Sequence, residues 1–209
     1  HILSHRYNRL YPPPFSYLMT KLWLLLIVAA ASRVLAQQAS RAHTILSKNE
    51  EIAFFHSCSG GEVDTVRRML KEHKGLAHAT TEEGESCLHL VAISGNLEIA
   101  QALVDSFADL NARTTFDGGL RMHVLSWHVY AGHHEIVKLL LDHGARINDD
   151  FDLSAQSDEK VTALDIAEKL SGGKTDSPNP DKFEITYKLL LERGGKKYRD
   201  LHGSDKDEL

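Results

Sequence analysis

An internal repeat constrains this chain more than any other feature of its sequence. Residues 84–112 and 124–148 share one pattern, in which a short apolar run, a glycine, a longer apolar run and an asparagine follow in the same order. The glycines Gly95 and Gly132 are 37 residues apart, and so are the two asparagines. A unit of this length cannot bury its apolar side alone, so neighbouring units must stack to complete a continuous core.

The apolar spacing within a unit predicts two short helices. In the first of these segments, small and apolar side chains stand at Leu88, Val91 and Ala92, before Gly95. The apolar positions after this glycine are Leu97, Ile99, Ala100, Leu103 and Val104. Because these positions recur at helical spacing on either side of a tight turn, we expect two antiparallel helices that each bury one face.

Two further segments fit the same frame. Upstream, residues 54–70 place Gly61 34 residues before the corresponding glycine. Downstream, residues 162–167 match the start of a unit and residues 183–191 match its second helix, with a turn-rich insert between them. The sequence therefore predicts about four units over residues 47–200, and the outer two are degenerate because one face of a terminal unit meets water.

The unit at residues 84–112 closely resembles the ankyrin repeat, and the second apolar run of the next unit is nearly the consensus of that family. The usual repeat has about 33 residues, so the four extra residues fall in the hairpin between Thr114 and His123. Ser126 stands where the family has a histidine. The resemblance implies an all-α fold, an ankyrin-repeat solenoid of about four helix-turn-helix units joined by hairpin-like fingers.

The resemblance also implies a binding surface for a protein partner, formed by the hairpin tips and the inner helices of a concave face. The corresponding residues are Glu82, Glu83, Glu85, Ile93, Phe116, Asp117, Arg121, Met122, Tyr130, Asp150, Phe151 and Asp152. Phe116, Met122, Tyr130 and Phe151 would then be exposed apolar groups beside acids, a mixture typical of an interface anchor with a polar rim. The alternative is that the long fingers fold back on their own core.

Residues 19–36 predict a signal peptide. A basic residue precedes the apolar run at residues 22–31, Arg33 interrupts it, and small residues lead to a cleavage site after Ala36. A membrane span needs about 20 apolar residues, so we expect no span in the mature chain. Residues 1–18 have no periodicity and are interpreted as translated upstream sequence or a fragment.

The last four residues, Lys206, Asp207, Glu208 and Leu209, match the tetrapeptide that retains proteins in the endoplasmic reticulum. On a tail predicted to be flexible, residues 201–209, they would be bound by a retrieval receptor. Together with the leader, they predict a resident of the endoplasmic reticulum lumen. The alternative is a cytosolic ankyrin adaptor whose start is wrongly chosen, with a chance match at the tail.

The charge balance narrows the class of partner. The chain has 24 basic and 29 acidic residues, a formal net charge of −5, and no Lys/Arg cluster suited to binding phosphates precedes the tail. We therefore expect a basic or neutral protein partner and no nucleic acid. The sequence shows no catalytic triad, phosphate loop or dinucleotide fingerprint. It predicts a scaffold or adaptor without a cofactor and not an enzyme, and an accessory subunit of a luminal enzyme stays as an alternative.

The many histidines raise the question of a metal site. Five of the 13 histidines fall in one unit, at His123, His128, His133, His134 and His143. They lack a recognised zinc-ligand spacing, and His89 and His133 occupy positions where the family uses histidine for hydrogen bonding and turn packing. Residues 150–161 also fail as a calcium loop, because alanine replaces the required glycine and valine the final glutamate. No metal is predicted.

The two cysteines are Cys58 and Cys87. The repeat frame places them five positions apart along neighbouring first helices, so their Cα atoms are expected to exceed the limit of about 7 Å for a disulfide. We expect two buried thiols. A disulfide is the alternative, because the register of the first unit is not fixed by the sequence and an oxidising compartment would preserve such a bond.

Overall fold

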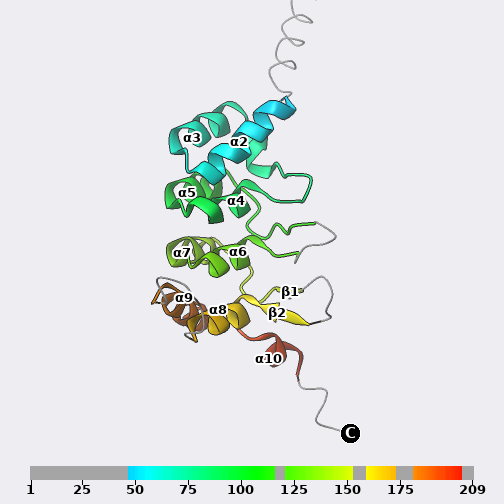
Figure 1. Ribbon diagram of the computed structural model, residues 1–209, viewed down its shortest axis with the longest axis vertical. Helices are drawn as coiled ribbons and strands as arrows, with labels where there is room; N and C mark the ends of the chain where they lie inside the picture. The colour runs from blue at the N-terminus through cyan, green and yellow to red at the C-terminus, as the bar shows by residue number, and fades with distance from the viewer. Residues whose placement is uncertain (1–46, 116–120, 153–158, 173–180, 204–209) are drawn as a thin grey trace, which may run out of the picture. The chain divides into compact units, whose positions relative to one another are not determined.

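The computed structural model describes residues 47–115, 121–152, 159–172 and 181–203 (Figure 1). The chain divides into His1–Leu46 and a compact unit, Ser47–Leu209, and only the second contains described residues. The predicted leader with Ala36, the finger residues Phe116 and Asp117, and the predicted retention signal at Lys206, Asp207, Glu208 and Leu209 lie outside the described residues.

The compact unit is a stack of helix pairs, as Figure 1 shows. The pairs are α2 (Lys48–Gly60) with α3 (Val63–Glu72), α4 (Cys87–Ser94) with α5 (Leu97–Asp105), α6 (Val124–Ala131) with α7 (His134–Asp142), and α8 (Ala163–Ser171) with α9 (Asp181–Glu192). A short 3-10 helix, η1 (Lys74–His78), follows the first pair and α10 (Tyr198–His202) follows the last. The predicted all-α solenoid of four helix-turn-helix units is confirmed.

Every first helix begins with the same local device, a cap residue paired with the residue three positions later. In α2 the backbone N–H of Ser47 donates to the Glu50 carboxylate at 2.8 Å, and in α4 Ser86 donates to His89 Nδ1 at 3.0 Å. In α8 Thr162 donates to Asp165 at 2.8 Å. Such pairs satisfy backbone donors that have no partner inside the helix, and so fix where it starts.

The cap of α6 uses the same pair in exchanged order. His123 is the cap residue, and its Nδ1 accepts the backbone N–H of Ser126 at 3.3 Å. The second unit has serine at the cap and histidine three residues later, whereas the third has histidine first and serine second. The histidine that Ser126 replaces is therefore present at the cap position instead, where it accepts the backbone N–H three residues later and not that of the cap.

The core runs along the stack between the helices. Ile99 and Leu103 of α5 are fully buried, and so are Leu88 and Val91 of α4, as predicted. Two predicted core positions are wrong: Ala92 is half-buried and Leu97 is 39% exposed. Leu97 precedes Ile99 by two residues, which places it on nearly the opposite side of a helix with 3.6 residues per turn.

The repeated asparagine, which helped to define the units, ties each unit to the next. The side-chain oxygen of Asn111 accepts the backbone N–H of Arg146 at 2.8 Å, and that of Asn148 accepts the backbone N–H of Lys196 at 2.7 Å. Asn148 also donates to the carbonyl oxygen of Gly194 at 3.3 Å. The asparagine therefore satisfies loop backbone groups across each junction.

The turn glycine of the second unit has a steric reason. Gly95 has a φ of +64°, a region that side chains with a Cβ rarely adopt. A Cβ at this position would lie 2.7 Å from the His133 ring, which packs against the turn. The expected role of His133 in turn packing is confirmed by this contact.

Cys58 and Cys87 form a disulfide with their Cα atoms 5.8 Å apart, so the prediction of two buried thiols is wrong. Cys58 lies between the two ends of α4: its sulfur bonds to Cys87 at the start of this helix, and its carbonyl oxygen accepts the hydroxyl of Ser94 at the end, at 3.1 Å. The predicted Cα separation combined two distances, the five positions between the cysteines along the helix axis and the spacing between stacked helices that run in register. The close, staggered packing of α2 on α4 makes the actual separation smaller.

Three hairpin-like fingers connect the units, and each closes against the cap of the following first helix. The closing pairs are Thr80 with Ser86, Arg113 with His123, and Asp150 with Thr162. In the third finger the pairing extends into a two-stranded antiparallel ladder of β1 (Asp150–Asp152) and β2 (Lys160–Thr162). Backbone pairing at the cap residue therefore fixes each finger relative to the first helix that follows it.

Candidate protein-interaction surface

Two exposed apolar side chains mark the first-helix face of the array. Ile93 near the end of α4 is 67% exposed, and Tyr130 near the end of α6 is 64% exposed. Each stands two residues before the turn glycine of its unit, so stacking places them at equivalent positions in neighbouring units. Because neither contributes to the core, both are available as anchors for a partner, a role in which tyrosine is enriched.

The first finger carries acids. Glu82 and Glu83 are exposed and Glu85 is half-buried. The Lys48 ammonium lies 2.6 Å from the carboxylate of Glu82, and this hydrogen bond lowers the pKa of Glu82. The carbonyl oxygen of Glu83 accepts the backbone N–H of Thr115 at 2.8 Å, which ties the first finger to the second.

A pocket of about 530 Å³ lies between the second and third fingers. It is lined by Arg113, Thr114, Thr115, Arg121, Asp150, Phe151, Asp152 and Lys160. Arg113 donates to the carbonyl oxygen of Asp150 at 2.7 Å and lies 3.5 Å from the carboxylate of Asp149, while Lys160 lies 3.0 Å from the carboxylate of Asp150. The pocket therefore presents charges of both signs.

The ion pair between Lys160 and Asp150 in this pocket keeps the carboxyl group of Asp150 ionised. Burial alone would raise the pKa of its carboxyl group, but the hydrogen bond and the charge of Lys160, with the charge of Arg113, outweigh burial and lower it. The carboxylate is therefore ionised at neutral pH, and the same contact raises the pKa of Lys160.

Phe151 is not the exposed anchor that the sequence predicted. It is 2% exposed, and its ring meets the ring of His123 edge to face, with centroids 5.6 Å apart. In β1 the side chains alternate between the two faces, so Phe151 points inward while Asp150 and Asp152 stay half-buried. The alternative of a finger folding back on the core is correct for this residue, and the alternation was the signal that could have shown it.

The remaining finger predictions divide between surface and interior. Arg121 is exposed and Met122 is half-buried, so the structure places Arg121 at the pocket but does not present Met122 as a free anchor.

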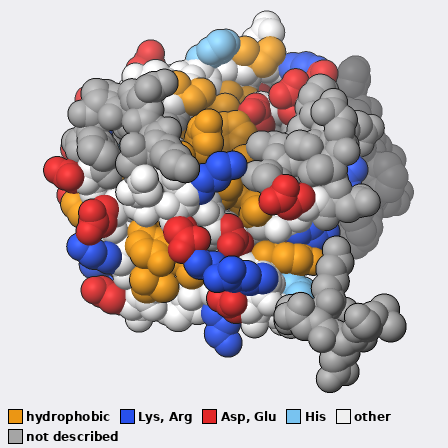
Figure 2. All heavy atoms as spheres, turned by 60° about the horizontal axis from the view of Figure 1, so that its bottom comes forward, with side chains coloured by type: hydrophobic (Ala, Val, Ile, Leu, Met, Phe, Trp, Pro, Cys, Tyr) orange, Lys and Arg blue, Asp and Glu red, His pale blue; other side chains and the backbone are white. Residues whose placement is uncertain are grey.

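Figure 2 shows that apolar side chains at the C-terminal end of the array are exposed in separate patches bordered by charged side chains. The candidate surface is therefore Ile93 and Tyr130 together with the pocket between the second and third fingers.

Two of the clustered histidines, His123 and His128, make structural hydrogen bonds. His123 and His128 are buried, and each Nε2 bonds to a backbone carbonyl oxygen at 2.9 Å, from Asp149 and Leu88 respectively. Burial lowers the pKa of His128 to about 3 and that of His89 to about 4, so both are neutral at pH 7. Among the described residues, no group of three or more histidines, cysteines or acids is arranged to hold a metal ion.

Phe107 is a notable residue that the sequence analysis missed. It is 85% exposed and has a φ of +61°, a strained region for a residue with a Cβ. The next unit has Gly144 at the equivalent position, with a φ of +91°. Aligning the two units would have shown a phenylalanine in place of a turn glycine, which was the available signal.

Comparison with known proteins identifies the repeat. A family model described as "Ankyrin repeats (3 copies)" matches residues 25–114, and one described as "Ankyrin repeat" matches residues 123–150. The chain therefore carries ankyrin repeats and folds as an ankyrin-repeat solenoid. An array of this kind is a protein–protein interaction module.

Several curated relatives are similar over part of their length. The chain is 28% identical over 122 residues to Ankyrin repeat and SAM domain-containing protein 6 of Rattus norvegicus, which covers 58% of this chain and 13% of the relative. It is 38% identical over 96 residues to Ankyrin repeat and KH domain-containing protein mask of Drosophila melanogaster, covering 44% of this chain and 2% of that protein.

A third relative covers more of the chain. This is the Transient receptor potential cation channel subfamily A member 1 homolog of Caenorhabditis elegans, 27% identical over 158 residues, or 72% of this chain and 13% of the relative. The chain thus spans less than a fifth of each of these three relatives. Among the described residues, no helix is both long and apolar enough to span a membrane.

Proposed function

We propose that this chain is an adaptor of the endoplasmic reticulum lumen that binds a protein partner through Ile93, Tyr130 and the pocket between its second and third fingers. The observation that carries the proposal is the pair of exposed apolar side chains at equivalent positions of neighbouring units. Tyr130 lies on α6, which follows the second finger, and this finger forms a charged pocket with the third. An apolar centre with a polar rim is typical of protein interfaces.

The charges of the finger side favour a partner of mixed or basic character. Glu82 and Glu83 are exposed on the first finger, and Asp150 and Asp152 line the pocket beside Arg113. A partner segment with a basic residue would meet these acids, and an apolar side chain would meet Tyr130. Charge complementarity of this kind directs association and register more than it adds affinity.

The disulfide supports the luminal part of the proposal. A bond between Cys58 and Cys87 persists in oxidising compartments and is rare in the cytosol, where thiols are kept reduced. The leader pattern ending at Ala36 and the tetrapeptide Lys206 to Leu209 would supply entry and retention, the latter through a retrieval receptor.

The binding surface is tested by substitution. Ile93→Ser combined with Tyr130→Ser is expected to reduce capture of luminal proteins by the tagged full chain by more than about tenfold, since interface anchors each contribute more than about 1 kcal/mol. Ile185→Ser on α9, where the side chain is 47% exposed, is the matched control and should leave capture unchanged. Equal capture by both variants would reject this surface.

A second candidate is an ankyrin adaptor that is not translocated. The observation favouring it is the start of the family match at residue 25, inside the predicted leader at residues 19–36. An Asn-Gly-Thr acceptor inserted within residues 173–180 separates the two candidates, because a translocated chain gains a glycan. The luminal proposal predicts a glycan that an endoglycosidase removes, and an unmodified chain would favour the second candidate.

A further inference from the structure

A second pocket lies away from the finger pocket, between the second helices of the first two units. It has a volume of about 450 Å³, and Arg67, Leu70 and Lys71 of α3 line it together with Lys74. Asp105 and Phe107, at the end of α5, form its other wall. The pocket thus combines three cations, one acid and one aromatic ring at the junction of two units.

Two of the charged groups in this pocket already have partners. Arg67 forms an ion pair with Glu98 at 3.0 Å, and the carboxylate of Asp105 accepts the side-chain amide of Gln101 at 2.8 Å. Within the described part of the chain, Lys71 and Lys74 have neither an ion pair nor a side-chain hydrogen bond. The Gln101 amide is neutral and leaves the negative charge of Asp105 in place, so the two lysines give the pocket a net positive charge of about one.

Phe107 completes the pocket at an energetic cost to the fold. Its backbone stands in the left-handed region, where the equivalent residues of the third and fourth units are Gly144 and Gly194. Hydrogen bonds hold this conformation, since Phe107 donates to the carbonyl oxygen of Val104 at 2.9 Å and Ala108 to that of Leu103 at 3.0 Å. With 85% of the residue exposed, packing inside the chain offers no compensation, and strain kept without compensation points to a functional constraint.

Of the three pocket residues Lys71, Lys74 and Phe107, only Lys71 is explained by stabilisation of a helix. Lys71 is in the last turn of α3, where a cation complements the partial negative charge of the helix end. Lys74 lies beyond that helix, in η1, and Phe107 belongs to the following unit. Helix stabilisation therefore does not account for Lys74 or Phe107.

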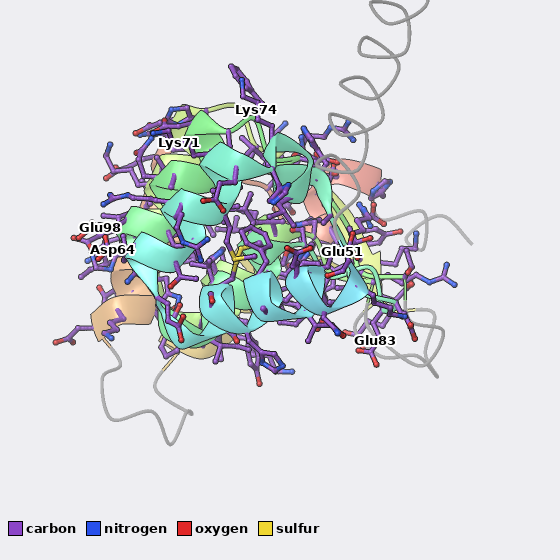
Figure 3. All side chains as sticks on the ribbon, turned by 90° about the horizontal axis from the view of Figure 1, so that it is seen from above. Glu51, Asp64, Lys71, Lys74, Glu83 and Glu98 are labelled. Atoms are coloured by element: carbon purple, nitrogen blue, oxygen red, sulfur yellow. A yellow bond between two sulfur atoms is a disulfide. The ribbon has the colours of Figure 1, made fainter. Side chains whose placement is uncertain are left out.

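We propose that this pocket, formed by Lys71, Lys74 and Phe107, binds an acidic segment of a partner protein that carries an apolar side chain. The two ammonium groups would pair with carboxylates, and the Phe107 ring would contact the apolar side chain. The whole chain has a formal net charge of −5, whereas this pocket has a net positive charge. Figure 3 shows Lys71 and Lys74 on one side of the molecule, with Glu51 and Glu83 on another.

The pocket is separate from the proposed finger surface, so one chain could hold two partner segments of opposite charge. Glu83 of the first finger lies on one side of the molecule, and the two lysines lie on another (Figure 3). A failure of the finger surface in the capture experiment would leave the present proposal intact, because none of the residues tested there lines this pocket.

The test uses a fluorescein-labelled peptide in which glutamates alternate with leucines, and a second peptide in which glutamines replace the glutamates. Fluorescence anisotropy with the full chain should show binding of the acidic peptide, weakened by added salt, and at least about tenfold weaker binding of the glutamine peptide. Phe107→Gly should weaken binding by about tenfold or more, while the protein becomes slightly more stable.

The lysines are tested with Lys71→Gln and Lys74→Gln, each expected to weaken binding of the acidic peptide by about threefold. Lys169→Gln, an exposed lysine of α8, is the control and should bind as the unchanged chain does. Equal affinity for the two peptides, or unchanged binding by the Phe107→Gly variant, would overturn the proposal. Self-association that Phe107→Gly abolishes, without peptide binding, would overturn it in favour of a second copy of the chain.

Discussion

The first helix of the second unit is joined to its two neighbours by different bonds. On one side, the disulfide of Cys58 and Cys87 links α4 to α2. On the other side, His128 of α6 donates from Nε2 to the carbonyl oxygen of Leu88 in α4, at 2.9 Å. Both junctions stack one first helix on another, but one depends on oxidation and the other on a neutral imidazole. Equivalent junctions in a repeat array can therefore respond to different chemical conditions.

Removing the disulfide should give the largest effect. A bond closing a loop of 29 residues constrains the unfolded chain, and its loss is expected to reduce the free energy of unfolding by about 3 kcal/mol. Cys58→Ala with Cys87→Ala, compared with the unchanged chain in urea unfolding, measures this. The reduced unchanged chain should match the variant, and equal midpoints under oxidising and reducing conditions would show that the bond does not form.

Acid should weaken the other junction. Burial lowers the pKa of His128 to about 3 in the folded chain, whereas the ordinary pKa of histidine, expected in the unfolded chain, is 6.5. Protonation therefore favours the unfolded state. The stabilisation is complete above pH 6.5 and is lost as the pH falls from there toward 3, at about 1.4 kcal/mol per pH unit. By pH 5 this histidine alone accounts for a loss of about 2 kcal/mol.

The variant His128→Val, which copies Val91 of the second unit, should reduce this pH dependence. At pH 7.5 it should cost about 1 kcal/mol, because the Leu88 carbonyl loses its donor. Urea unfolding at pH 7.5 and pH 5 checks both effects, with the exposed His78 changed to glutamine as the control. An unaltered difference between the two pH values would mean that other groups cause the acid sensitivity.

The third unit has the serine and histidine of its helix cap in the opposite order to the second unit. Whether the two orders are equivalent can be tested by giving the third unit the order of the second. Ser126→His alone, at a fully buried position, and His123→Ser alone, which also loses the bond to Asp149, should each reduce the free energy of unfolding by more than about 1 kcal/mol, the usual effect of losing a cap. The double variant would recreate the pair of Ser86 and His89 and should regain the part of that loss that belongs to the cap. Additive losses in this double-mutant cycle would show that the two orders are not equivalent.

The helix ends of the same two units offer the smallest and most direct comparison. Phe107→Gly should raise the free energy of unfolding by about 0.5 to 1 kcal/mol, because glycine adopts the left-handed backbone without steric cost. Gly144→Ala should lower it by a similar amount, since nothing lies within 4 Å of the added Cβ and only the φ of +91° opposes it. Thermal unfolding of both variants measures the pair, and a destabilised Phe107→Gly variant would mean that the ring supports the fold.

The helices and the repeat units were predicted from two regularities of the sequence, the repeat length and the spacing of apolar residues. Apolar spacing located Ile99 and Leu103 in the core, and the resemblance to the ankyrin repeat placed Ile93 and Tyr130 on the surface, where both are exposed. These properties depend on one helix and its own neighbours. The repeat frame therefore predicted them without knowledge of how closely the units approach.

Properties that depend on the approach between units could not be predicted in the same way. The frame gave the positions of Cys58 and Cys87 along their helices, but the stagger between α2 and α4 is set by packing and does not follow from the repeat length. The burial of Phe151 depends on the ladder between β1 and β2, which the repeat frame did not predict. The pocket at Phe107 needs two units side by side, which no single unit encodes.

The exchanged cap of the third unit has a consequence for how such arrays change over time. Serine and histidine fill the two positions in either order, and in both orders the histidine accepts a backbone N–H at the helix start, that of the cap residue in α4 and that of the third helical residue in α6. A comparison that scores each position separately counts two mismatches where the physical requirement is met. Repeats that have drifted by such exchanges would be undercounted, and scoring the pair as one feature would recover them.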